Sequence, residues 1–560
     1  MTRLAETIAR SAVWVGGALT IASVLYITLD VLARKFIGRP IGGADELSSY
    51  AFAISTTWSL AFATLQRANV RVDVLYQYLP VRVSAVLDWI SLVSLGTFMG
   101  FLTYYAYDVV AASILQNSHA NTPLATPLWI PQGLWFIGLI FMCIVLALML
   151  LRASVALVTG DIDTVKALAG VRSAKEEAED WSTNNEFLLV AIPLFILLGE
   201  VLLRAGFAER MYSAMSLWLS WLPGGLMHAN IGASALFAAT SGSSVATAAT
   251  VGTVSIPQIK RYGYNEPLFL GSLAAGGTLG ILIPPSINLV IYGVLTNSSV
   301  PKLYLAGIIP GFLLAGLFMM IIVVTCIAKP AWGGQRVTAT WGERLRSLVH
   351  LAPPLGIFLL VVGSIYAGLA TPTEAAALGV TGALILAAWF GRLSLSMLRE
   401  AVEGTMKASA MIMLIIIAAG FLNFVMSATG ITDAVVGSIS GLGLSPVQML
   451  VVIVIFYLIL GCFMETLSMM ITTIPIVAPI MIALGYDPIW LGILIIILVE
   501  AALITPPVGL NLFVVQSLRK SGSMGAVIVG SIPFVLAMGL LLVLISLFPD
   551  LCLLLPRIFS

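Results

Sequence analysis

Residues 256–286 read IPQIKRYGYNEPLFLGSLAAGGTLGILIPPS, and residues 478–508 read APIMIALGYDPIWLGILIIILVEAALITPPV. The two stretches share a Pro, a Gly-Tyr pair and a Pro-Pro pair at the same relative positions. The corresponding residues, each pair 222 apart, are Pro257 and Pro479, Gly263 and Gly485, Tyr264 and Tyr486, Pro284 and Pro506, and Pro285 and Pro507. Two more pairs follow at an interval of 223: Gly307 with Gly530, and Pro310 with Pro533. So many coincidences are not expected by chance, so the chain contains a duplicated unit.

Each copy carries its Pro-Pro pair inside an apolar run. Proline has no backbone N–H, and its ring clashes with the preceding turn, so a helix must break there. Inside a bilayer, the carbonyl and amide groups freed by a break are tolerated only where they are buried in protein or line a cavity. One break would indicate a packing kink, but the same break in both copies is typical of the binding site of a secondary transporter.

The composition indicates a polytopic membrane protein. Of 560 residues, 60% are hydrophobic and 9% are charged, with a mean hydropathy of +1.06, whereas soluble domains contain about 25% charged residues. The net charge of +1 gives no indication of a nucleic-acid partner. The four cysteines lie in apolar runs without CxxC spacing, so we expect neither disulfides nor a metal centre. The first apolar stretch, 13–31, lacks a small-residue cleavage site and is long enough to span, so we expect a membrane helix there.

Residues 1–152 form a first block with four apolar spans, near 12–33, 47–65, 84–115 and 128–151. Asp45 and Glu46 open the second span, where acidic groups favour the positive end of the helix dipole. Arg34 could pair with Glu46 across the turn, or both could be ordinary anchoring charges. Residues 153–183 are charged and have no run long enough to cross, so they are predicted to be a surface linker or an interfacial helix.

The large part, residues 184–560, holds the copies at about 186–328 and about 351–548. Each copy is expected to contain a crossing, an amphipathic arm, a hairpin, the broken helix and a final span. The arms are expected near 206–219 and 430–442. Each hairpin surrounds a polar tip: TSGSS in the first (the first tip, 240–244) and GCFMET in the second (the second tip, 461–466). Neither flank of a tip has the ~20 apolar residues that a crossing needs, so both hairpins are predicted to be re-entrant.

The second copy begins with two spans that the first lacks, near 351–370 and 375–391. Three crossings in the first copy plus these two place the matching part of the second copy five crossings later. An odd offset inverts its orientation, as in many secondary transporters. The predicted fold is an all-α polytopic membrane protein, in which a four-helix block precedes an inverted repeat with two re-entrant hairpins and two broken helices.

Several motifs carry a resemblance to a known family. LDVLARKFIGRPIGGADELSSYAF (29–52) and QRANVRVDVLYQYLP (66–80) resemble the small membrane subunit of tripartite ATP-independent periplasmic (TRAP) transporters. The motifs that resemble the large subunit are FAATSGSS (237–244), IPPS (283–286), GLATPTE (368–374) and ITPPVGLN (504–511). The match covers nearly the whole chain in the right order, so it implies a fused small and large subunit.

The resemblance implies an elevator-type secondary transporter in the bacterial inner membrane, driven by Na⁺. A separate periplasmic solute-binding protein would deliver a small organic anion to it. The residues are compatible, because no Walker A motif occurs and no nucleophile constellation is present, so neither an enzyme nor a cofactor other than Na⁺ is expected. His119, His228 and His350 are scattered and are expected near the membrane interfaces.

The predicted sites lie where each tip would meet a break. Hard cations such as Na⁺ need oxygen ligands, which carbonyls freed at tips and breaks can supply. The residues of the first Na⁺ site would be Ser241, Gly242, Ser243, Gly280 and Pro284, and those of the second Gly461, Met464, Thr505 and Pro506. The exposed N-terminal ends of half-helices favour an anionic solute. The residues expected to bind it are Ser243, Ser244, Asn288, Glu465, Thr466 and Asn511.

Some of these residues have a second interpretation. Asn288 and Asn511 could hydrogen-bond a carboxylate or simply satisfy backbone groups freed at the breaks. Glu465 and Glu500 are carboxylates in apolar runs, which are costly unless partnered. Either could serve a cation or accept bonds from neighbouring amides.

The distribution of Lys and Arg gives two orientations that conflict at the junction. In the first block and linker, nine lie on the amino-terminal side (Arg3, Arg10, Arg67, Arg71, Arg82, Arg152, Lys166, Arg172 and Lys175) and three on the other (Arg34, Lys35 and Arg39). This places the amino terminus and the linker in the cytoplasm. In the large part, thirteen against two (Lys302 and Arg557) place the first arm there too. Either the chain is a shortened variant, or 186–203 does not cross as a single span.

Two other classes of protein stay open. One is a divalent-anion/Na⁺ carrier that works without a binding protein, against which the attached four-helix block argues. The other is a membrane scaffold or receptor that transports nothing. The solute is also open among sialic acids, dicarboxylates, other organic acids and sulfonates.

Overall fold

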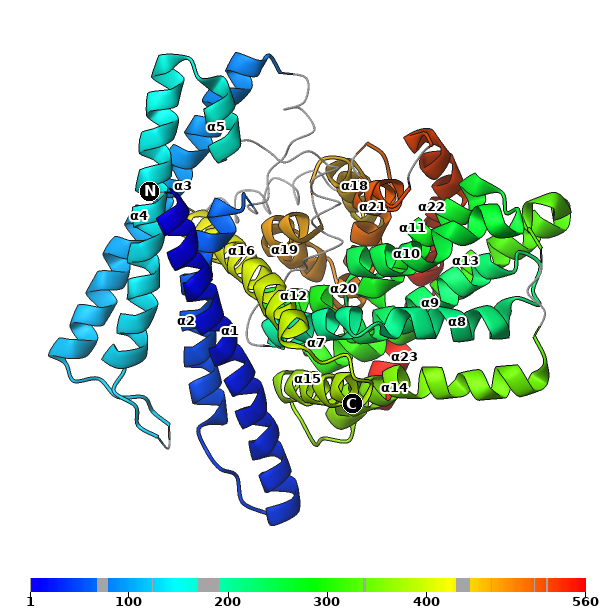
Figure 1. Ribbon diagram of the computed structural model, residues 1–560, viewed down its shortest axis with the longest axis horizontal. Helices are drawn as coiled ribbons and strands as arrows, with labels where there is room; N and C mark the ends of the chain where they lie inside the picture. Colours follow the sequence, from blue (N-terminus) through cyan, green and yellow to red (C-terminus); the bar gives the residue numbers. More distant parts are fainter. Residues whose placement is uncertain are drawn as a thin grey trace.

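The computed structural model describes residues 2–67, 79–122, 124–169, 191–335, 339–429, 444–464, 466–507, 509–519 and 522–559. All regular elements among them are helices (Figure 1). Nine helices of this described part are long and apolar enough to cross a membrane. The predicted class, an all-α polytopic membrane protein, is thereby confirmed.

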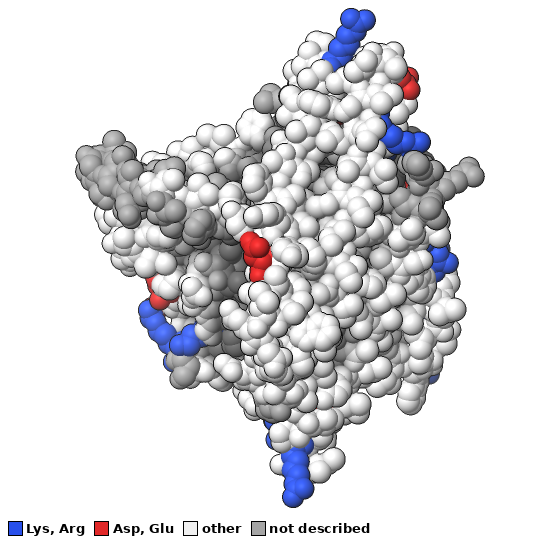
Figure 2. Space-filling model, turned by 90° about the vertical axis from the view of Figure 1, so that its left-hand side faces the viewer, with Lys and Arg blue, Asp and Glu red and all other residues white. Residues whose placement is uncertain are grey.

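The first block stands apart at one side of the molecule (Figure 1). Its helices are α1 (Thr2–Leu32), a π-helical turn (Ala33–Ile37), α2 (Ala44–Leu65), α3 (Val81–Leu115), α4 (Trp129–Thr159) and α5 (Ile162–Ala169). The four long helices cover the four apolar spans, and α4 continues past the expected end at 151. The face of the molecule on this side is a broad surface with few charged side chains (Figure 2).

After the first copy, the chain continues with a 3-10 turn (Pro330–Trp332) and the helices α14 (Trp341–Tyr366), α15 (Pro372–Trp389) and α16 (Leu395–Ala428). Helix α1 packs against α15 and α16, and Thr28 Oγ1 lies 2.9 Å from Thr381 Oγ1. Of the two interpretations of Arg34 and Glu46, the pair across the turn is not the arrangement that the structure has. Arg34 Nη2 donates to Glu374 Oε1 of α15 at 2.6 Å, because the block packs on a helix 340 residues away, and Glu46 accepts from Tyr50 at 3.0 Å.

The junction contains α7 (Ala191–Arg204). Its 14 residues make a helix of about 21 Å, shorter than the roughly 30 Å hydrocarbon core of a bilayer. Residues 170–190 lie outside the described part. The interpretation that 186–203 does not cross as a single span therefore stays a prediction.

The first copy contains the arm α8 (Phe207–Leu219), the hairpin helices α9 (Leu226–Ser241) and α10 (Ser244–Tyr262), α11 (Glu266–Leu282), α12 (Ile287–Thr296) and α13 (Val300–Ala328). The matching helices of the second copy are α18 (Pro446–Gly461), α19 (Thr466–Ala483), α20 (Pro488–Ala502), α21 (Leu510–Ser517) and α22 (Met524–Leu547), followed by α23 (Asp550–Ile558). The arm expected near 430–442 lies outside the described residues. Helix–tip–helix and helix–break–helix units occur in both copies, as predicted.

Corresponding side chains make corresponding bonds in the two copies. Asn265 caps α11 by accepting from Leu268 N at 3.1 Å, and Asp487, 222 residues later, caps α20 by accepting from Ile489 N at 2.7 Å. Tyr264 accepts from the first residue of α9, Leu226 N, at 2.9 Å, and Tyr486 donates to the first residue of α18, Pro446 O, at 2.9 Å. These bonds give the same start to both broken helices and both hairpins.

The two copies pack against each other through their broken helices and final spans. Helix α11 of the first copy packs on α22 of the second through Gly271 and Gly530, whose backbones leave no space for a Cβ atom. Helix α20 of the second copy packs on α13 of the first. A Cβ atom on Gly307 of α13 would lie 3.8 Å from the Ile493 side chain of α20 and 2.6 Å from Leu282 O of α11. These positions match in sequence, since Gly271 corresponds to Ile493 and Gly307 to Gly530. Each broken helix is therefore held by the final span of the other copy.

Candidate functional site

The first tip lies directly against the first break, residues 283–286 between α11 and α12. The two halves of this broken helix meet at 42°. At the tip, Gly242 has a left-handed backbone (φ 64°), and a Cβ atom there would lie 2.9 Å from Pro285 O. A Cβ on Gly280 would lie 2.7 Å from the carbonyl of Ser243, and Ser244 Oγ donates to Thr278 O at 3.3 Å. Two glycines thus permit the close approach of tip and break.

Two half-helices begin at this contact. Ser243 has an extended backbone and caps α10 by accepting from Ala246 N at 3.4 Å. Ser286 caps α12 in the same way, accepting from Leu289 N at 3.3 Å. The N-terminal ends of helices of 19 and 10 residues, with their free N–H groups and positive dipole ends, therefore lie at the first tip and first break.

The second tip meets the second break, residues 503–509 between α20 and α21, in the same manner. Gly461 lies so close to Ala502 that its added Cβ would overlap the Ala502 side chain. Cys462 Sγ donates to Pro506 O at 3.4 Å. Thr505 Oγ1 donates to Ala501 O at 2.6 Å, and Met464 N donates to Leu460 O at 2.9 Å. Thr466 begins α19 and is buried, whereas Glu465 lies outside the described residues.

Each tip packs on the helix before its break through a glycine, but the glycine lies on the helix in the first copy and on the tip in the second. In the first, the helix supplies it (Gly280) and the tip supplies Ser243. In the second, the tip supplies Gly461, and the helix carries Ala502 at the position that corresponds to Gly280. Each contact therefore has one side without a side chain, which lets backbone approach backbone.

The two asparagines are buried beside the breaks and have unused hydrogen-bonding capacity. Asn511 is fully buried; its Nδ2 donates to Ala274 O of α11 at 3.2 Å, and its Oδ1 has no partner among the described residues. Asn288 is 4% exposed, and its Nδ2 likewise lacks a partner there. The side chain of Asn511 thus bonds to the other copy, while its backbone N–H donates to Leu503 O of its own break at 3.0 Å.

Sequence reasoning missed several polar residues around this centre. Asn230 and Ser234 of α9 face α11, where Gly276 leaves room for Ser234; Asn230 Oδ1 and Ser234 Oγ have no partner in the described structure. For Cys462 the sequence indicated only that it forms no disulfide and no metal centre. The Gly276-Gly277 pair inside an apolar helix was the available signal, since adjacent glycines indicate close approach of a neighbour.

His228, one of the three histidines expected near the membrane interfaces, lies in the first turn of α9. It is fully buried in the protein, and its ring Nε2 lies 2.8 Å from Pro223 O; its depth in the membrane stays a prediction. It fixes the start of α9 to the turn before it.

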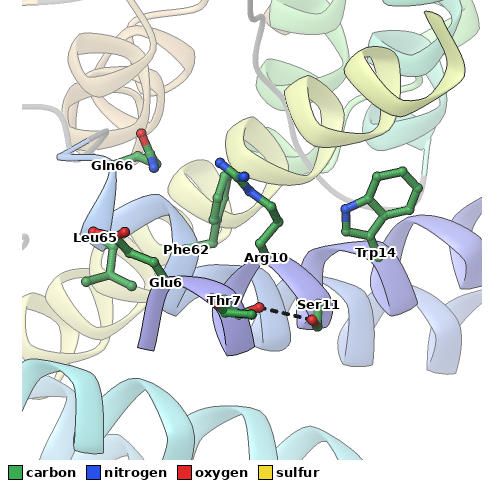
Figure 3. Close-up of a pocket in the computed structure, with 8 residues that line it drawn as sticks. All are labelled: Glu6, Thr7, Arg10, Ser11, Trp14, Phe62, Leu65 and Gln66. Atoms are coloured by element: carbon green, nitrogen blue, oxygen red, sulfur yellow. Dashed lines mark hydrogen bonds between the residues drawn. The ribbon is translucent and has the colours of Figure 1, made fainter. Parts of the chain in front are cut away.

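A cavity of about 280 Å³ lies elsewhere, at one end of α1 and α2. It is lined by Glu6, Thr7, Arg10, Ser11, Trp14, Phe62, Leu65 and Gln66 (Figure 3). None of these residues belongs to a tip or a break. The cavity therefore does not extend the candidate site.

Two hairpin tips that rest on two helix breaks, inside an interlocked duplicated helical fold, define a membrane protein of the secondary-transporter class. The DctM component of tripartite ATP-independent periplasmic transporters matches residues 134–551, and the DctQ component of the same transporters matches residues 23–155. The chain belongs to the TRAP transporter family and carries the small and the large membrane component in one polypeptide.

Two relatives with TRAP transporter names agree with this assignment. The C4-dicarboxylate TRAP transporter large permease protein DctM of Pseudomonas aeruginosa is 36% identical over 67% of this chain and 88% of its own length. The isethionate TRAP transporter permease protein DctMQ of Oleidesulfovibrio alaskensis is 28% identical over 90% of this chain and 87% of its own length. The solved YdaH transporter of Alcanivorax borkumensis aligns with a TM-score of 0.43 at 17% identity, over 64% of this chain and 87% of that one.

Proposed function

We propose that this protein takes up an organic anion by Na⁺-driven secondary transport with an elevator mechanism. A separate periplasmic solute-binding protein delivers the anion. The observation that carries the proposal is the contact of each tip with the break of its own copy, which gathers freed backbone oxygens and half-helix ends at two matching places. Residues 1–152 act as the small subunit, 153–183 as a cytoplasmic linker and 184–560 as the large subunit, with the amino terminus in the cytoplasm.

The Na⁺ ions bind at the tip–break contacts. Carbonyl oxygens of residues 241–243, Gly280 and Pro284 serve the first ion, and those of Gly461, Met464, Thr505 and Pro506 serve the second. Oxygen ligands suit a hard cation, and a break supplies carbonyls without an intrahelical partner. The support is that Gly242 lies against the Pro285 carbonyl and Cys462 against the Pro506 carbonyl.

The anion binds between the two contacts. Its charge is favoured by the N-terminal ends of α10 and α12, and Ser243, Ser244 and Thr466 contribute hydroxyl groups. The unpartnered amide Nδ2 of Asn288 and the buried amide of Asn511 can donate to a carboxylate or sulfonate. One relative is named for C4-dicarboxylate, a carboxylate, and another for isethionate, a sulfonate.

Replacement of Na⁺ by K⁺ is expected to abolish uptake. The protein would be reconstituted with its binding protein, and uptake of labelled solute would be measured with either ion outside, without ATP. A carrier that works without a binding protein would show the same uptake when that protein is left out, and a scaffold would show none. Equal uptake in Na⁺ and K⁺ would overturn the proposal.

Ser243→Ala and Thr505→Ala are each expected to weaken the apparent Na⁺ affinity of uptake about five- to a hundred-fold, since one lost hydrogen bond is worth roughly 1–3 kcal/mol. Both variants should remain folded and inserted. Ser11→Ala is the matched control for Thr505→Ala, because the Ser11 hydroxyl also donates to a carbonyl of its own helix, Thr7 O at 3.0 Å, far from the tips. Wild-type Na⁺ dependence in both variants would move the ion sites elsewhere.

A further inference from the structure

Glu500 is a carboxyl in the middle of the molecule for which the proposed transport gives no role. It lies on α20, is fully buried, and neither of its oxygens has a hydrogen-bond partner among the described residues. The backbone of Leu282, the last residue of α11, lies close to it but without hydrogen-bond geometry. A side chain of the second copy thus reaches the edge of the first break.

The position of Glu500 relates it to both tip–break contacts. Leu282 immediately precedes the first break, and Ala502, two residues after Glu500, is the residue on which the second tip rests. If either contact opens during transport, the surroundings of Glu500 change. Movement of either tip would therefore change the environment of the Glu500 carboxyl.

The first copy shows that the fold itself does not require an acid here. Thr278 occupies the corresponding position, 222 residues earlier. It is buried too, and its Oγ1 donates to Ala275 O of its own helix at 2.8 Å. The hydroxyl of Thr278 is thus satisfied within its own helix, whereas an ionised carboxylate at this position would be a buried charge without compensation, which is strongly unfavourable.

Among the described residues, no charged side chain of the surrounding helices bonds to Glu500. The helices packed against α20 are α11, α12, α13, α18, α19, α22 and α23. Their ionisable side chains are Glu266, Tyr292, Lys302, Tyr304, Cys326, Tyr457, Asp550, Cys552 and Arg557, while α19 and α22 carry none. None of these bonds to Glu500 in the described part of the chain, which points to a small cation, such as a proton, as the group that neutralises the carboxyl.

We propose that Glu500 is a proton site between the two copies, occupied while both tip–break contacts are closed and released to water when one opens. The carboxylic acid is the closed form, and opening gives the carboxylate and one proton. This site is separate from the two Na⁺ sites and has no counterpart in the first copy. Its part in the cycle rests on the proposed transport, but the proton on the closed form can be measured without transport.

The first test is the pH dependence of thermal unfolding of the purified full-length protein in detergent. Occupancy of one proton site falls about ten-fold per pH unit above its midpoint. The stability that the bound proton contributes is present at low pH and is lost as pH rises. The unfolding temperature of the wild type should therefore decrease as the pH is raised from about 6 to about 9. The unfolding temperature of Glu500→Gln, whose side chain stays neutral, should change less over this pH range. Glu403→Gln is the control, because Glu403 is a partly exposed carboxyl of α16 paired with Arg399 at 3.1 Å.

The second test is Na⁺-driven uptake over the same pH range. Wild-type uptake should depend on pH, and Glu500→Gln and Glu500→Thr, the residue of the first copy, should remove that dependence. Glu500→Thr serves if the glutamine variant fails to fold. Identical pH profiles of wild type and both variants in unfolding and uptake would overturn the proposal. Unfolding that is independent of pH, with weakened Na⁺ affinity in Glu500→Gln, would also overturn it and would indicate Na⁺ at Glu500. Loss of Na⁺-driven uptake by the wild type itself would contradict only the transport mechanism, since the unfolding test stands without it.

Discussion

Gly530→Ala is expected to leave little folded protein in the membrane. The added methyl group would overlap the carbonyl of Pro267 at the start of α11, and a backbone carbonyl in a helix cannot turn aside. Overpacking typically costs 1–3 kcal/mol, and with rigid backbone on both sides we expect about 3 kcal/mol or more. The measurement is the yield of monodisperse protein after extraction, together with its thermal unfolding midpoint.

Gly539→Ala is the matched control for this prediction. It lies on the same helix, α22, and its added Cβ would meet nothing within 4 Å. Alanine in an exposed helix interior stabilises by about 0.5–1 kcal/mol relative to glycine, so this variant should be at least as stable as the wild type. If Gly530→Ala matches Gly539→Ala in yield and unfolding midpoint, α11 and α22 do not approach as closely as described.

Gly461→Ala is expected to stop uptake while leaving the protein folded. The new methyl group would collide with the side chain of Ala502 and push the second tip away from α20. The tip must then give up its contact with the second break, where Cys462 Sγ now lies 3.4 Å from Pro506 O. Uptake in proteoliposomes should fall to background, and apparent Na⁺ affinity should fall in any residual activity.

The double variant Gly461→Ala with Ala502→Gly tests the cause. It moves the small residue from tip to helix, the arrangement that the first copy has at Ser243 and Gly280. Uptake should return in large part, reduced by the loss of about 0.5–1 kcal/mol for glycine near a helix end. Full activity of Gly461→Ala, or no recovery in the double variant, would show that this contact does not control transport.

Much of the fold could be predicted, because the features that define it are local. A Pro-Pro pair removes backbone donors wherever it stands, so the breaks at 283–286 and 503–509 could be placed to within a few residues. The polar tips stood out because each lay between apolar runs too short to cross. The arm expected near 206–219 is α8. The fourth span was expected to end at 151, but α4 continues as a helix through the less apolar residues that follow, to Thr159.

The candidate site could be predicted in part for the same reason. Tips and breaks carry their own signals, and their pairing within each copy followed from the duplication. Asn288 and Asn511 were singled out because they follow the breaks, and both are buried there. Ser234 carries no signal of its own, since a serine in an apolar helix is ordinary, and Cys462 was not distinguished from the other residues of the second tip.

The sequence by itself determined the duplicated unit, the class of membrane protein and the places where helices must break, because each of these depends on backbone chemistry within a few residues. Only the tertiary structure decided which surfaces meet. It brings Arg34 to Glu374 instead of Glu46, Gly271 to Gly530, and Glu500 to the edge of the first break. These approaches depend on how whole helices pack, and residues far apart along the chain carry no local record of one another.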